Sequence, residues 1–136
     1  YRLTLHEPTG ERQVTVDLLE TARLLLGLVP KKQRDVVDAQ GQRHQLMEAV
    51  LASDLARGTL APKAVLLWLR TVDDERSDEA AKIEYHWLVD AVQIHFKREL
   101  TDYGHVFYNR AAFWPQGQLA TSLDALLADR MMERAR

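Results

Sequence analysis

A continuous helical pattern from about Asp78 to Leu100 is the feature that most constrains the fold of this chain. Ser77 precedes the pattern and is a favourable N-cap residue. The apolar residues fall on two adjacent stripes, which are Ile83, Trp87, Ala91 and Ile94, and Tyr85, Leu88, Val92 and Phe96. A long helix with so little polar surface has to be covered by other elements. We therefore expect it at the centre of the fold, with Trp87 among the most buried residues.

Size and composition indicate one globular domain. The chain has 136 residues, 46% hydrophobic and 28% charged, which is enough for one core over residues 1–136. Its net charge of −2 provides no global field that would attract nucleic acid or anionic lipid. The absence of cysteine excludes disulfides, thiolate nucleophiles and cysteine-bearing metal sites. Because no apolar run approaches the ~20 residues that cross a bilayer, we expect a cytoplasmic protein without membrane contact.

The first segment, residues 1–16, has the pattern of a β-hairpin. Apolar and polar residues alternate on both sides of residues 7–10, where Pro8 and Gly10 favour a turn. A short helix is expected to follow and to end near Gly27.

Residues 33–45 partly repeat this pattern, so we expect a second hairpin that turns at Gln40 and Gly41. A helix over about residues 46–57 would follow, with Gly58 just beyond its end. Two adjacent valines interrupt the alternation, which leaves a helix or a loop over residues 33–43 as the alternative.

Two further helices complete the predicted fold. The run AVLLWL at residues 64–69 is apolar on nearly every side, which we interpret as a buried helix that starts near Pro62. A capping pattern at residues 121–124 predicts a last helix to the end of the chain. The expected fold is thus α+β and predominantly helical, with one or two small β-hairpins packed on a bundle of four to five helices.

Candidate catalytic and metal-binding residues are few. His86 and His95 each precede a carboxylate by four residues, but they lie nine residues apart and so on opposite sides of the helix. No metal-binding, nucleophile or phosphate-binding motif occurs, and we expect no metal and no cofactor. An enzyme with a dispersed site near His95, His105 and Tyr108 is the third of three functional hypotheses.

A small basic cluster carries the second hypothesis. Lys31, Lys32, Arg34 and Arg43 belong to a segment that we interpret as a connector over residues 31–43. If these side chains lie together, they could contact phosphates, which would make the protein a regulator associated with nucleic acid.

An aromatic-rich segment, residues 102–117, carries the first hypothesis, since it holds five of the ten aromatic residues of the chain. Gly104 is expected to end the long helix, and a short helix or strand is expected around residues 106–112. Aromatic residues and arginine are common at the centres of protein interfaces. The predicted partner-binding residues are Tyr103, His105, Tyr108, Arg110, Phe113 and Trp114.

The favoured function is therefore a non-enzymatic, regulatory protein-binding module, with a homodimer as one form of assembly. The sequence does not identify the partner. The high content of alanine, leucine and arginine hints at a bacterial or phage origin.

Overall fold

The computed structural model describes residues 19–58, 60, 62–72, 75–124 and 126. Residues 19–26 are helical, as are residues 123 and 124. The other elements are β1 (Leu28–Val37), β2 (Arg43–Leu51), α2 (Ala52–Ala56), β3 (Val65–Arg70), α3 (Asp78–Phe96), the 3-10 helix η1 (Leu100–Asp102), β4 (His105–Tyr108) and β5 (Ala120–Ser122).

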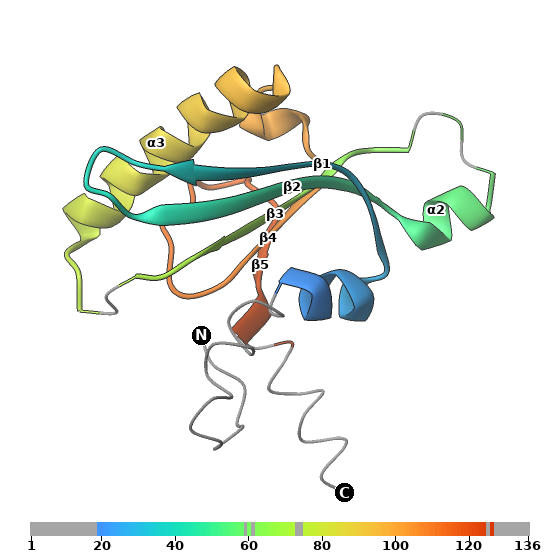
Figure 1. Cartoon of the computed structure of the whole chain (residues 1–136), viewed down its shortest axis with the longest axis horizontal. Coiled ribbons are helices and arrows are strands. Elements are labelled where there is room, and N and C mark those ends of the chain that lie inside the picture. The colour runs from blue at the N-terminus through green and yellow to red at the C-terminus, as the bar shows by residue number, and fades with distance from the viewer. Residues whose placement is uncertain (1–18, 59, 61, 73–74, 125, 127–136) are drawn as a thin grey trace, which may run out of the picture.

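The five strands form one mixed sheet in the order β1-β2-β3-β4-β5 (Figure 1). β2 is antiparallel to both β1 and β3, whereas β4 is parallel to β3 and β5 is parallel to β4. A parallel pair needs a long crossover connection, and α3 supplies it between β3 and β4.

Helices lie on both faces of this sheet, with α3 on one side and helical residues 19–26 on the other (Figure 1). The core on the α3 side includes Leu46, Leu66, Trp68, Leu88, Val92 and Phe96. The core on the opposite side includes Leu19, Ala22, Met47, Leu67, Leu69 and Leu123. Because β3 is covered on both faces, all six of its residues are buried.

The predicted bundle of four to five helices is wrong, because a five-stranded mixed sheet organises the described part of the chain. The run at residues 65–70 is strand β3 instead of a helix. A short apolar run gives the same pattern in a helix buried all round and in a strand buried on both faces. The helix expected over residues 46–57 is also largely wrong, since β2 continues to Leu51 and only Ala52–Ala56 is helical.

The second hairpin is confirmed. β1 and β2 pair over most of their length and turn at residues 38–42, where Gly41 has a φ of 84°. The Asp38 carboxylate accepts hydrogen bonds of 2.9 Å from the backbone N–H groups of Gln40 and Gln42, which fixes the turn. The predicted basic connector is therefore mostly strand.

The long helix is confirmed from its N-cap, since the Ser77 hydroxyl accepts a hydrogen bond from the Ala80 N–H. It ends earlier than expected, because Lys97 adopts a left-handed conformation with a φ of 59°, so Gly104 does not end it. The buried residues of α3 are Glu84, Leu88, Ala91, Val92 and Phe96. Trp87 is only partly buried, against our expectation, and Trp68 on β3 is the buried tryptophan at 1% exposure.

The element expected around residues 106–112 is confirmed as β4, although it starts at His105 and ends at Tyr108. The predicted hairpin over residues 1–16 lies outside the described residues, as does most of the predicted last helix.

Candidate functional site

A buried arginine at the end of β3 organises the candidate site. Arg70 is 4% exposed and forms two hydrogen bonds with the Glu84 carboxylate of α3, at 3.2 Å and 2.8 Å. Arg76 also pairs with Glu84, at 2.7 Å. Burial lowers the pKa of Arg70 while Glu84 raises it, and a guanidinium remains charged in either case. The carboxylate therefore holds two arginines against the first half of α3.

Asn109 connects this network to the segment that follows β4. Its side-chain amide pairs with the Arg70 backbone in both directions, at 2.9 Å and 2.8 Å. The Arg70 guanidinium donates to the carbonyl of Asn109 and, at 2.9 Å, to that of Ala111. β3, α3 and residues 109–111 are thereby fixed relative to one another.

A second buried polar group lies beside the first. The His44 Nδ1 accepts a 3.1 Å hydrogen bond from the Trp68 indole, and Nε2 lies 3.0 Å from the Asp38 carboxylate. Since the indole can only donate, Nε2 carries the hydrogen and the imidazole is neutral. The His44 ring is fully buried and stacks on Trp87 at 3.8 Å. This arrangement positions the hairpin turn and leaves His44 no free nitrogen for catalysis.

The stability of this cluster should fall in acid. Burial lowers the pKa of His44, although Asp38 opposes that shift. Burial would raise the pKa of Asp38, but the hydrogen bonds from His44, Gln42 and Gln40 lower it. Both pKa values are thus lower in the folded protein than in the unfolded chain. The two groups therefore stabilise the fold above their unfolded pKa values, and this contribution is lost as the pH falls toward their folded pKa values.

We expect the free energy of unfolding to decrease from about pH 7 to pH 5, because His44 has an unfolded pKa of about 6.5. Urea titrations across this range measure the slope. His44→Gln should flatten it, whereas His86→Gln should not, because His86 is exposed on α3. Equal slopes in all three proteins would show that His44 does not control the pH dependence.

Between the β1–β2 turn and α3 lies a cavity of about 640 Å³, here called the hairpin groove. Asp38, Ala39, Gln40 and Gln42 form one wall, and the rest of the lining comes from Thr71, Val72, Arg76, Ala80, Ile83, Glu84 and Trp87. Ile83 is 62% exposed in this groove. The groove therefore presents apolar side chains to solvent between walls that the buried polar groups hold in place.

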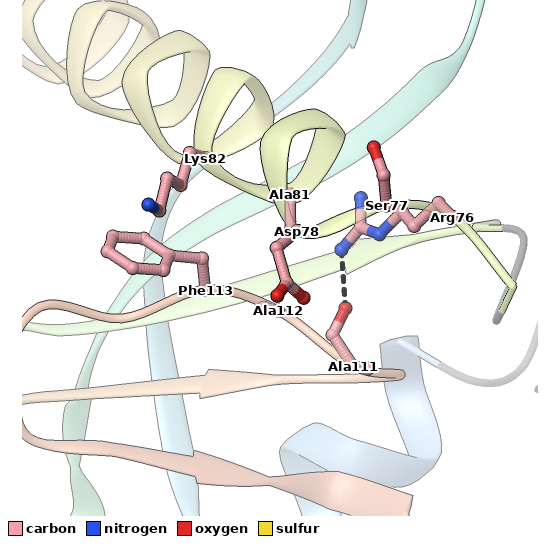
Figure 2. Close-up of a pocket in the computed structure, with 8 residues that line it drawn as sticks. All are labelled: Arg76, Ser77, Asp78, Ala81, Lys82, Ala111, Ala112 and Phe113. Atoms are coloured by element: carbon pink, nitrogen blue, oxygen red, sulfur yellow. Dashed lines mark hydrogen bonds between the residues drawn. The ribbon is translucent and has the colours of Figure 1, made fainter.

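A second cavity, of about 450 Å³, shares Arg76 with the hairpin groove and is here called the Phe113 pocket (Figure 2). It is lined by Arg76, Ser77, Asp78, Ala81, Lys82, Ala111, Ala112 and Phe113. The Lys82 ammonium lies 5.7 Å from the centre of the Phe113 ring, and Arg76 donates a 2.5 Å hydrogen bond to the Ala111 carbonyl. Both cavities thus meet at the N-terminal end of α3.

The structure separates the six predicted partner-binding residues. Phe113 lines its pocket, whereas Tyr108 and Trp114 do not line it and pack against the α3-side core. Tyr103 lies within that core at 3% exposure. His105 lies on the other face of β4, where its ring contacts Phe107. Arg110 is partly buried, and its backbone N–H donates to Asp124 at 3.0 Å.

The structure also shows where the residues of the nucleic-acid hypothesis and of the enzyme hypothesis lie. Lys31, Lys32 and Arg34 lie on β1 and Arg43 begins β2, and all four are exposed. Tyr108 and His105 lie on opposite faces of β4, so the structure does not bring both into one site with His95, which lies on α3.

Sequence reasoning missed Arg70 and Glu84, and it placed Asn109 on an exposed patch beside Arg110, whereas Asn109 is buried. Arg70 and Asn109 are 39 positions apart, and no motif connects them. The one available signal was the position of Arg70 directly after five apolar residues. A charged side chain at the end of such a buried run is itself buried only when it has a partner of opposite charge.

Within the described residues, no three histidine or acidic side chains converge as a metal-binding cluster. No described helix has the length and apolar character to cross a membrane. Comparison with protein-family models, with curated proteins and with solved structures found no significant match.

Proposed function

We propose that this protein is a non-enzymatic protein-binding module whose contact surface surrounds the N-terminal end of α3. The observation that carries the proposal is the exposure of Ile83 at 62% within a groove that also includes Val72 and Trp87. Exposed apolar side chains in a concave, preformed site are typical of binding surfaces. The Phe113 pocket, which shares Arg76 with the groove, extends this surface.

The fixed walls of the groove support binding in preference to catalysis. The polar side chains beside it are engaged with each other, as in the pairs Arg70–Glu84 and His44–Asp38. A group that already has its hydrogen-bond partners holds a surface in shape and reduces the ordering cost of association. We therefore expect an apolar side chain of a partner protein to insert beside Ile83 and Trp87.

Ile83→Asp should weaken binding of the partner by about 30-fold, which corresponds to the ~2 kcal/mol of an interface hot spot. Ile94→Asp is the matched control, because Ile94 is 67% exposed on the same helix. Eleven residues of helix rise place it about 16 Å from Ile83 along the axis. Isothermal titration calorimetry with the purified partner measures both affinities.

Neither variant should change the melting temperature, since neither side chain belongs to the core. The proposed surface is incorrect if Ile83→Asp and Ile94→Asp bind equally well, or if Ile83→Asp lowers binding only because it unfolds the protein.

A further inference from the structure

The outer edge of β1 is open in the described part of the chain. β1 is the first strand of the sheet and has ten residues, of which all from Pro30 to Asp35 are exposed. Among the described residues no strand pairs with its outer side. The register with β2 shifts only between Pro30 and Lys32, so β1 is regular from Lys32 to Val37. Such an edge offers unpaired backbone groups to an added strand.

This edge carries three cations against one carboxylate, Lys31, Lys32 and Arg34 against Asp35. None of the three cations forms an ion pair with a described acidic residue. Glu48, which lies opposite Lys32 on β2, is buried and pairs with Arg98 at 2.5 Å. The strand therefore carries an excess of positive charge, and its three cations have no ion-pair partner among the described residues.

The alternation of a strand places Lys32 and Arg34 on the same face as Val36, which packs on the α3 side. A second copy of β1 would set these cations against each other, which disfavours pairing of two identical chains. Nucleic acid also fits poorly, because β1 and β2 contain no Phe, Tyr or Trp for base stacking and Asp35 interrupts the cations.

We propose that the outer edge of β1 binds an extended acidic segment of a partner protein as a sixth strand. Carboxylates at alternate positions of that segment face Lys32 and Arg34, while its backbone pairs with β1. The turn that follows β1 lines the hairpin groove, so a strand on this edge runs toward the groove. This inference rests on the proposed function, because it takes the ligand to be a segment of a partner protein.

The test uses the full chain and an eight-residue peptide with glutamate at alternate positions and threonine or valine between them. We expect peptide-induced NMR shifts on β1, and affinity at least ten-fold weaker for K32E/R34E. A peptide with lysine in place of glutamate should bind K32E/R34E and not the original protein. Ile83→Asp should leave peptide binding unchanged. The experiment therefore tests the β1-edge site independently of the proposed binding surface at the hairpin groove.

Three results would overturn the proposal. The first is equal affinity of the glutamate and lysine peptides for the original protein. The second is slow hydrogen exchange at every amide of Lys32 to Val37 in the isolated chain, which would mean that the edge is already occupied. The third is displacement of the peptide by a twelve-nucleotide single-stranded DNA at lower concentration, which would assign the cations to phosphate.

Discussion

Glu84→Gln should lower the free energy of unfolding by about 3–5 kcal/mol, because the buried Arg70 guanidinium would lose its countercharge. Arg70 is 4% exposed and Glu84 is 8% exposed, so water does not replace the lost interaction. Arg76 would lose the same partner. Urea denaturation followed by circular dichroism measures the loss.

Glu79→Gln is the matched control, because Glu79 is exposed in the first turn of the same helix. Removing its charge affects only the helix dipole and should cost less than about 1 kcal/mol. The double variant Arg70→Met/Glu84→Leu should recover part of the loss, since both charges of the buried pair are then removed. A loss below about 1 kcal/mol for Glu84→Gln would show that solvent reaches the pair.

Trp68→Ala should lower the free energy of unfolding by about 3–5 kcal/mol, the range for removing a large buried aromatic side chain. Trp68 is 1% exposed, lies under the Arg70 guanidinium at 4.0 Å and contacts the Trp114 ring edge-on at 5.9 Å. Its removal also leaves His44 without a donor. The same denaturation experiment measures this change.

Trp87→Ala provides the comparison, since Trp87 is partly buried and lines the hairpin groove. Its replacement should cost less stability than that of Trp68 and should weaken partner binding. Equal or greater destabilisation by Trp87→Ala would mean that Trp87 belongs to the core, as the helical stripe by itself suggests.

The sequence predicted those parts of the fold that depend on local chemistry. Ser77 caps α3 because a hydroxyl satisfies a free backbone N–H, and Gly41 permits the positive φ of the β1–β2 turn. Both effects act within a few residues, so they can be recognised without knowledge of the tertiary structure.

The sheet could not be predicted in the same way. β3 has six consecutive buried residues because helices cover both of its faces, and this removes the alternation by which a strand is recognised. The sequence also does not show which apolar stripe of α3 packs on the sheet. In the structure Leu88, Val92 and Phe96 are buried against it, whereas Ile83 and Ile94 of the other stripe are exposed. Ile83, from this second stripe, is the exposed apolar residue of the proposed binding surface.

The candidate site depends on contacts that are distant in sequence. Arg70, Glu84 and Asn109 meet because β3, α3 and the segment after β4 converge at one end of the sheet. The aromatic segment was identified by composition, but composition does not distinguish Tyr103 in the core from Phe113 at a pocket. That distinction follows from the register of β4 and from the connection that follows it.

Site-specific photo-crosslinking in cells of the source organism tests the central claim most directly. A photoreactive phenylalanine analogue is placed at position 83 in the hairpin groove, at position 113 in the Phe113 pocket, or at position 94 as the exposed control. We predict that positions 83 and 113 cross-link the same partner protein and that position 94 does not. Cross-linking of that protein with equal efficiency from position 94, or none from position 83, would contradict a binding surface at the N-terminal end of α3.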